Sequence, residues 1–155
     1  MKRHEALIPL SHDHHHGLMM AQLIKKGAPV YKDLPKSIED KVNYTKNFYK
    51  TDLAKHFESE EKVLFPVVMG KDYELDKLIE EVVGEHKLIQ KLVESLSVKI
   101  NPEDKLDRIG ILLENHIRKE ERVLFEKIQA VMTEEELDNL VGKIKAVKTN
   151  ECDIK

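Results

Sequence analysis

The sequence predicts an all-α fold, an antiparallel up-down four-helix bundle followed by a short fifth helix. Three observations favour it: strand signals are almost absent, apolar residues recur at helical spacing, and capping or breaking residues separate the periodic stretches. Long amphipathic helices joined by short connections pack as antiparallel neighbours. Since 155 residues with 41% hydrophobic content suit one core, we expect a single domain over residues 1–150 and a tail over residues 151–155.

The first two helices are defined by caps and breakers. Ser11 is a favourable N-cap and predicts a first helix that reaches about residue 26, where Gly27 stops it. Ser37 with Asp40 resembles a capping box and opens a long second helix. We expect this helix to end at about residue 65, because Pro66 follows.

The remaining helices follow from apolar spacing and from two further start signals. A third helix is expected over residues 73–98. Asn101, with Pro102 at the first helical position, predicts a fourth helix to about residue 132. Thr133 and Glu136 form a capping box for a short fifth helix that fades near residue 147.

Charge and hydropathy exclude several classes of partner. The net charge is −3 and no basic stripe is present, so we expect no nucleic-acid partner. No apolar run approaches the roughly 20 residues that span a bilayer, and the N-terminus lacks the apolar region of a secretory signal, so no membrane partner is expected. Cys152 is the only cysteine. This excludes a disulfide framework and favours a cytoplasmic location.

The most informative feature is a pattern that occurs twice, H-x-x-x-E-E-[KR]-V-L-F, at residues 56–65 and 116–125. On an α-helix, residues four apart lie on one face with their Cβ atoms about 6 Å apart. Each copy therefore aims an imidazole and a carboxylate at one point, and two such pairs facing each other suit two metal ions. The four candidate ligands are His56, Glu60, His116 and Glu120.

The first and third helices should each add a histidine. On the third helix His86 is followed by apolar residues at core spacing, so it faces the core. On the first helix an acidic residue precedes His14 as one precedes His86, which favours His14. The apolar spacing after His86 is better matched by His15, so both remain candidates. The other histidines near the N-terminus are His16, which leads an apolar face of its own, and His4 and His12, which we expect outside the site.

Acidic residues beside these ligands have two interpretations. Glu61, Glu85 and Glu121 are placed to orient the imidazoles, but residues adjacent to ligands often point to solvent. We expect Glu61 and Glu121 to face solvent. Tyr49, seven residues before His56 on the same helix face, is expected to pack in the core.

With these residues, the chain resembles the hemerythrin-like HHE cation-binding domains over essentially its whole length. The resemblance rests on the Leu10-Ser-His-Asp-His-His15 segment, the two H-x-x-x-E motifs and the lone core histidine between them. It implies a non-haem di-iron centre with two bridging carboxylates, and a small diatomic molecule or peroxide as its ligand. Zinc is the weaker alternative, because zinc prefers closed four-ligand sites that often contain thiolate.

Two departures from the oxygen-carrying hemerythrins narrow the expected function. Gln90 stands where they have the second histidine of H-x-x-x-H, and the last motif ends in Glu120 where they have H-x-x-x-x-D. The pattern is closer to di-iron proteins linked to iron–sulfur repair and nitrosative stress. We therefore expect a protein that binds or senses O₂ or NO, or handles iron. The alternatives are a di-iron oxidoreductase acting on peroxide or NO, and a zinc-binding or structural bundle. A homodimer is possible.

Overall fold

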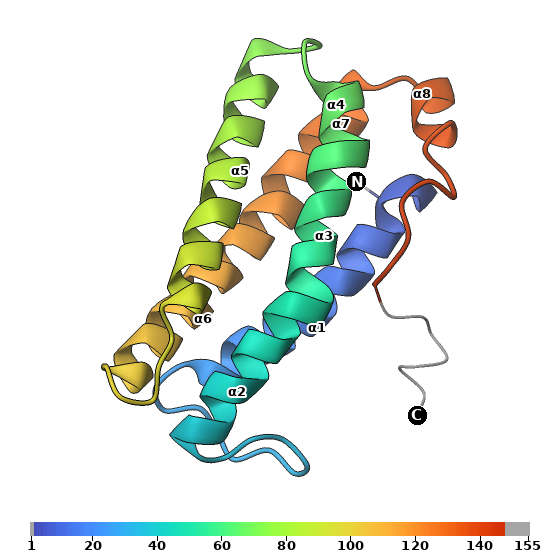
Figure 1. The fold of residues 1–155 in the computed structure, drawn as a ribbon. Coiled ribbons are helices and arrows are strands. Elements are labelled where there is room, and N and C mark those ends of the chain that lie inside the picture. Colours follow the sequence, from blue (N-terminus) through green and yellow to red (C-terminus); the bar gives the residue numbers. More distant parts are fainter. Residues whose placement is uncertain (1, 148–155) are drawn as a thin grey trace.

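A computed structural model describes residues 2–147 of the chain. This part is helical and contains no β-strand, which confirms the predicted all-α class. The long helices lie side by side along their lengths (Figure 1). In the same part of the chain, no helix is both long enough and apolar enough to cross a membrane. The expected tail at residues 151–155, with Cys152, lies outside the described residues.

The N-terminal helix begins earlier than expected. A 3₁₀ turn, η1 (Glu5–Leu7), leads directly into α1 (Ile8–Ile24). Pro9 lies in the first turn of α1, where its missing N–H is not needed. The expectation that Ser11 caps the helix was wrong, because this residue lies inside α1 and its hydroxyl donates to a carboxylate of another helix.

Residues 38–68 form one continuous run of helix, the second of the long helical rods. Its backbone alternates between α-helical and π-helical segments. As predicted, Ser37 caps its start, with Oγ accepting from the Asp40 N–H. The rod continues through Pro66 and ends before Gly70, whose φ is +91°. Pro66 lies just after the junction between η3 and α4, where the backbone changes from π-helical to α-helical. The segments are α2 (Ile38–Phe48), η2 (Tyr49–Leu53), α3 (Ala54–Ser59), η3 (Glu60–Leu64) and α4 (Phe65–Val68).

The C-terminal half also consists of long helices, one of which again contains a π-helical segment. Asn101 is the N-cap residue expected before Pro102, although its side chain makes no capping hydrogen bond. The capping box of Thr133 and Glu136 is present, but its helix is shorter than predicted and ends at residue 138. The elements are α5 (Tyr73–Glu94), α6 (Pro102–Lys119), η4 (Glu120–Leu124), α7 (Phe125–Val131) and α8 (Glu134–Asp138).

The segments η2, η3 and η4 are π-helical, with one residue more than an α-helical turn. Two of them start at Glu60 and Glu120, which occupy the same position in the repeated motif. The repeat is therefore a repeat of backbone conformation as well as of sequence. Single π-turns of this kind are frequent at functional sites.

The hydrophobic core is divided into two clusters along the helix axes. On α1, Leu10 belongs to one cluster and Met20 to the other; on α5, Val82 and Ile89 are divided in the same way. The rods α2–α4 and α6–α7 also supply residues to both clusters. Each long rod therefore crosses a layer that separates two apolar regions.

Candidate metal centre

Buried polar side chains fill the layer between the two hydrophobic clusters. Each long rod contributes one histidine, and the two π-turns of the repeat contribute a glutamate each. Every member is at most 3% exposed. The layer consists of His14 on α1, His56 on α3, His86 on α5, His116 on α6, and Glu60 and Glu120 at the start of η3 and η4.

The layer forms two groups of donor atoms that share both glutamates. One group adds His14 and His56 to Glu60 and Glu120, and the other adds His86 and His116. Within each group, one donor atom of every residue lies within 4.8 Å of the others. Contacts inside the layer include His14 Nε2 to Glu120 Oε1 at 2.8 Å, His86 Nε2 to Glu60 Oε1 at 3.1 Å and His56 Nε2 to Glu60 Oε1 at 3.5 Å.

Several of these donor atoms make no hydrogen bond within the described chain. They are both carboxylate oxygens of Glu60, Oε2 of Glu120, and Nε2 of His86 and His116, all buried. A buried polar atom that makes no hydrogen bond costs about 1–3 kcal/mol, so leaving several in one layer is expensive even where opposite groups lie close together. Imidazole nitrogen and carboxylate oxygen are ligands for borderline cations such as iron. The residues present therefore fit a metal centre.

The outer nitrogen of each histidine is fixed by a carboxylate. With Nδ1–H donating outward, the Nε2 lone pair of a neutral imidazole faces the centre of the layer, as in carboxylate–histidine–metal sites. The pairs are His14 with Glu121, His86 with Glu61 and His116 with Glu85, each at 2.7 Å, and His56 with Asp13 at 3.0 Å.

The expectation that Glu121 faces solvent was wrong, whereas Glu61 is exposed as expected but also accepts a hydrogen bond from a histidine. Successive residues on a helix differ in direction by roughly 100°. When the first glutamate of the repeat points into the layer, the next one points sideways, toward a neighbouring helix. There it meets the outer nitrogen of a histidine on that helix. The double Glu of the repeat was the sequence signal, but only the packing of the helices shows that both are used.

The structure distinguishes between the two candidates on the first helix. His14 lies in the buried layer, whereas His15 is exposed and belongs to neither donor group. His16 is half-buried and lines a neighbouring cavity. His4 lies away from the layer, where its Nδ1 accepts from the Ala6 N–H and caps η1.

The pKa values of the buried side chains are shifted in different directions within the layer. Burial alone lowers the pKa of His14, but hydrogen bonds to Glu120 and Glu121 outweigh it and raise this pKa to about 9. Burial lowers the pKa of His86 to about 3. Burial beside the charge of Glu120 raises the pKa of Glu60 well above its usual value. A cation among these groups stabilises ionised carboxylates and neutral imidazoles, so it takes the place of protons.

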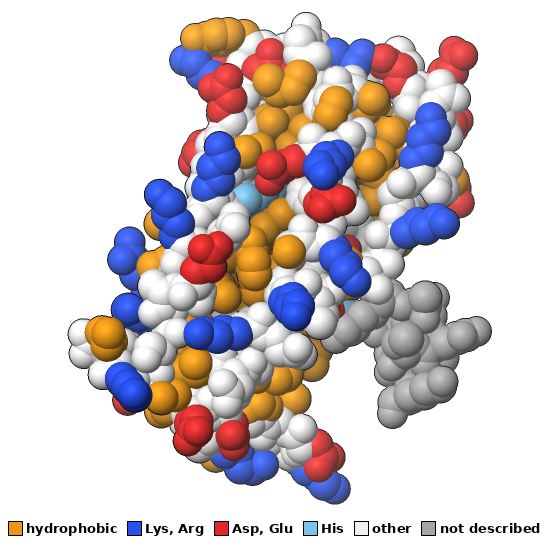
Figure 2. All heavy atoms as spheres, in the orientation of Figure 1, with side chains coloured by type: hydrophobic (Ala, Val, Ile, Leu, Met, Phe, Trp, Pro, Cys, Tyr) orange, Lys and Arg blue, Asp and Glu red, His pale blue; other side chains and the backbone are white. Residues whose placement is uncertain are grey.

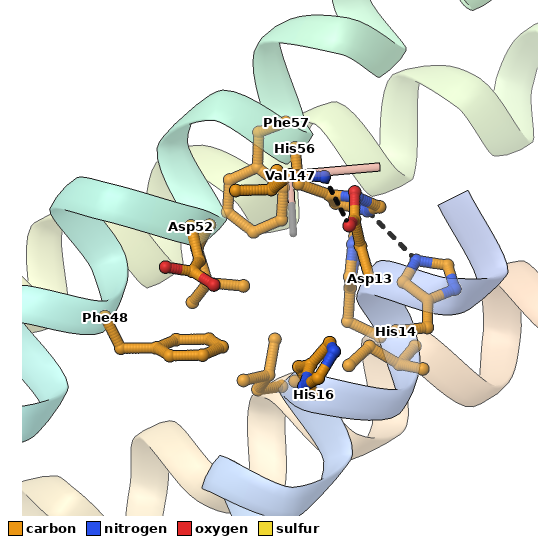
Figure 3. A pocket seen from close by; sticks show the side chains of 13 residues that line it. Asp13, His14, His16, Phe48, Asp52, His56, Phe57 and Val147 are labelled. Atoms are coloured by element: carbon orange, nitrogen blue, oxygen red, sulfur yellow. Dashed lines mark hydrogen bonds and ion pairs between the residues drawn. The ribbon is translucent and has the colours of Figure 1, made fainter. Parts of the chain in front are cut away.

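A small cavity adjoins the layer. It is lined by His14, His56 and His116 of the layer and by other residues that include Phe48 and Asp52. Figure 3 labels His14, His56, Phe48 and Asp52 around it. About 10 Å³ is available to the centre of a water-sized molecule. This is room for about one water or a diatomic molecule.

An aromatic side chain closes a second approach to the layer. Phe57 stacks on His86 with ring centroids 3.9 Å apart and planes at 13°. Tyr49 packs against the edge of Phe57, with centroids 6.4 Å apart, and lies in a surface groove that also includes Glu61. Figure 2 shows a small area of histidine surface between hydrophobic and acidic side chains on this face.

Comparison with known proteins points to one family. The sequence profile of the hemerythrin HHE cation binding domain matches residues 4–128. A protein of Nostoc sp. (strain PCC 7120) described as a DNA nickase is 29% identical over 120 residues. The match covers 74% of this chain and 32% of that protein, so the chain spans about a third of its relative. No solved structure matches.

Proposed function

Because this chain belongs to the hemerythrin HHE cation binding domain family, we propose that it is a non-haem di-iron protein that binds or senses O₂ or NO, or handles iron. Cation binding is the property of the family. One observation supports two ions: Glu60 and Glu120 each belong to both groups of buried donor atoms. A carboxylate has two oxygens and can serve two ions, whereas each Nε2 of a histidine can serve one.

The proposed ligand set follows the two groups. His14 and His56 would hold one ion, His86 and His116 the other, with the two glutamates shared. Iron in this site would supply electrons to O₂, NO or peroxide. The up-down arrangement of four antiparallel rods, with α8 as a short fifth helix, is the architecture that we propose for holding this set.

The chain's own residues have defined roles in this proposal. The outer carboxylates hold each Nδ1 proton and keep Nε2 directed inward. The apolar clusters on either side exclude water from the layer, which strengthens every charge interaction inside it. The cavity beside His14, His56 and His116 admits a molecule of diatomic size.

A second candidate function is a di-iron oxidoreductase that consumes peroxide or NO. The observation in its favour is that Asp52 and His16 line the same cavity as three histidines of the layer. Ionisable side chains at that place can hold and move protons, which turnover requires and reversible binding does not. A zinc-binding or structural bundle is less well supported, because six donors without thiolate do not match a closed tetrahedral zinc site. The net charge of −3 gives no support for extending the relative's DNA nickase activity to this chain.

Elemental analysis of aerobically purified protein, together with its visible spectrum, tests the proposal. About two irons per chain, with the charge-transfer bands of a ferric pair, are expected. One zinc, or no metal after iron-replete expression, would contradict it. Titration with O₂ and NO then separates the two functions, since a binding protein gives reversible spectra and an oxidoreductase consumes its substrate over many turnovers.

A further inference from the structure

We propose that residues 139–147, here called the strap, control entry to the cavity beside the metal layer. We further infer that Asp13 is the positioning residue through which the strap holds His56. The inference rests on the proposed metal centre, and it assigns a role to a part of the chain that lies beyond the matched family residues 4–128.

The strap is anchored at its start. Leu140 and Ile144 are 4% and 2% exposed and belong to the hydrophobic cluster that also contains Leu10 of α1. The preceding helix α8 is tied to the N-terminus, because His4 Nε2 lies 3.1 Å from carboxylate oxygens of both Glu134 and Asp138. From α8 the strap runs back alongside α1 (Figure 1).

The end of the strap reaches the cavity. Val147 lines it, and its backbone N–H donates to Asp13 Oδ1 at 2.8 Å (Figure 3). This polar bond joins the end of the strap to α1. Leu140 and Ile144 fix the strap by apolar contacts, so this hydrogen bond determines where its end lies.

The same carboxylate holds a histidine of the layer. Asp13 Oδ2 accepts from His56 Nδ1 at 3.0 Å, and the Asp13 side chain is 7% exposed. One oxygen of a buried carboxylate is therefore bonded to the strap and the other to a candidate metal ligand.

The other outer carboxylates are not held in this way. Glu121 accepts from the Ser11 hydroxyl at 2.8 Å, and Glu85 accepts from Lys119 at 2.5 Å. Both of these hydrogen-bond donors are side chains within the matched family residues, and Glu121 also forms a longer ion pair, at 3.6 Å, with the side chain of Arg3. Asp13 is held by the backbone of a segment outside them, which makes it the position at which strap movement reaches the layer.

Movement of the strap has two consequences. It removes one wall of a cavity that has room for about one water molecule. Larger molecules can then enter, and small molecules can enter faster. It also releases one oxygen of Asp13, which loosens the orientation of the His56 ring. Entry of a small molecule and the position of His56 are thereby linked through one carboxylate.

Substitutions at residue 147 separate the backbone bond from the side chain. Val147→Pro removes the N–H and keeps apolar bulk, whereas Val147→Ala keeps the N–H and removes bulk. Ala146→Pro is the matched control, since it adds the same backbone restriction one residue earlier and leaves the Val147 N–H in place. Each variant is loaded with cobalt(II), whose visible bands report site occupancy, and mixed with azide in a stopped-flow instrument.

Loss of a hydrogen bond to a charged acceptor predicts that azide binds about 10- to 100-fold faster to Val147→Pro. Ala146→Pro should stay within about twofold of the original chain. Val147→Ala keeps the hydrogen bond but removes part of one cavity wall, so its rate should rise less than that of Val147→Pro. Equal azide rates in all four proteins, at equal cobalt content and circular dichroism, would overturn the proposal. An original chain that takes up no cobalt would instead contradict the proposed metal function.

Two measurements on metal-free protein keep the inference testable if Val147→Pro does not fold. The Val147 amide of the original chain should be protected from hydrogen exchange, and exchange at the rate of an unstructured peptide would overturn the strap. In Asp13→Asn one carboxylate oxygen becomes an NH₂ group. The remaining oxygen can accept from the Val147 N–H or from His56 Nδ1–H, so one of these two donors loses its acceptor. The imidazole ¹⁵N shifts of His56 should then move toward the Nε2–H tautomer, and unchanged shifts would contradict the positioning role of Asp13.

Discussion

Glu61 accepts a hydrogen bond from the Nδ1–H of His86 at 2.7 Å, although its own side chain is 38% exposed. The bond joins η3 to α5 across the groove that Phe57 closes from within. A charged residue at the surface thus determines which nitrogen of a buried histidine faces the metal layer. The same geometry occurs at His116 and Glu85, also at 2.7 Å.

Replacing this outer carboxylate should weaken cation binding. Glu61→Ala removes the acceptor of His86 Nδ1, and loss of such a partner typically costs about 10- to 100-fold in metal affinity. Competition with a chromophoric chelator measures the change. Glu58→Ala is the control, because Glu58 is exposed on α3 and pairs with Lys62 instead of a histidine. Equal affinities of the two variants would show that Glu61 does not orient His86.

The shared glutamates predict the stoichiometry. Glu60→Ala or Glu120→Ala should lower the metal content toward one ion or none, because each carboxylate belongs to both donor groups. Elemental analysis after identical loading measures the content, with circular dichroism to verify that the helices are retained. Two ions in both variants would rule out the shared role of these residues.

A pair of glycine substitutions tests the close packing of α1 on α6. A Cβ on Gly110 would lie 2.8 Å from the Ala21 carbonyl oxygen and 2.7 Å from Lys25 Cγ, so Gly110→Ala forces the helices apart. Such overpacking typically destabilises by about 1–3 kcal/mol. At Gly84 on α5 a Cβ meets nothing within 4 Å, and Gly84→Ala should stabilise by about 0.5–1 kcal/mol. Urea unfolding of the metal-free proteins measures both changes, and a shift of the same sign in the two variants would contradict this packing.

The cap of α8 predicts a pH dependence of stability. The ion pair with Lys71, aided by the Thr133 backbone, lowers the pKa of Glu136 from its ordinary value of 4.5. A carboxyl with a lowered pKa in the folded state stabilises the fold above pH 4.5, and the contribution is lost as the pH falls through the lower folded value. Glu136→Gln should therefore lower the thermal midpoint at pH 7 and have progressively less effect below pH 4.5. Glu135→Gln, at the adjacent exposed residue, is the control. A Glu136→Gln deficit that persists unchanged at low pH would exclude this ion pair as its cause.

Much of the fold could be predicted from the sequence because the patterns that determine it are local. The capping residues Ser37 and Thr133 and the repeated motif depend on residues within a few positions of each other, and the structure has both caps where they were predicted. The class of fold followed from apolar spacing, the near absence of strand signals, and the capping and breaking residues between the periodic stretches. The predicted N-cap at Ser11 was wrong. A serine near a helix start is usually a cap, but here Pro9 allows the helix to begin earlier.

The outer part of the site was not readable for a physical reason. Whether Glu121 meets a histidine depends on the rotation of two helices about their axes, and the π-turns change that rotation without an obvious sequence signal. The choice between His14 and His15 depends on the same rotation. The bond from Val147 to Asp13 joins opposite ends of the chain, so no local pattern reports it.

The division of the hydrophobic core has a consequence for folding. Each apolar half has its own contacts. In the polar layer between them the outer nitrogens of the histidines are bonded to carboxylates of neighbouring helices, but several inner donor atoms make no hydrogen bond. A bound cation would add bonds between the four rods in this layer, at donor atoms that otherwise make no hydrogen bond. Metal loading should therefore strengthen the coupling between the two apolar halves, and thermal unfolding should sharpen as well as shift when the cation binds.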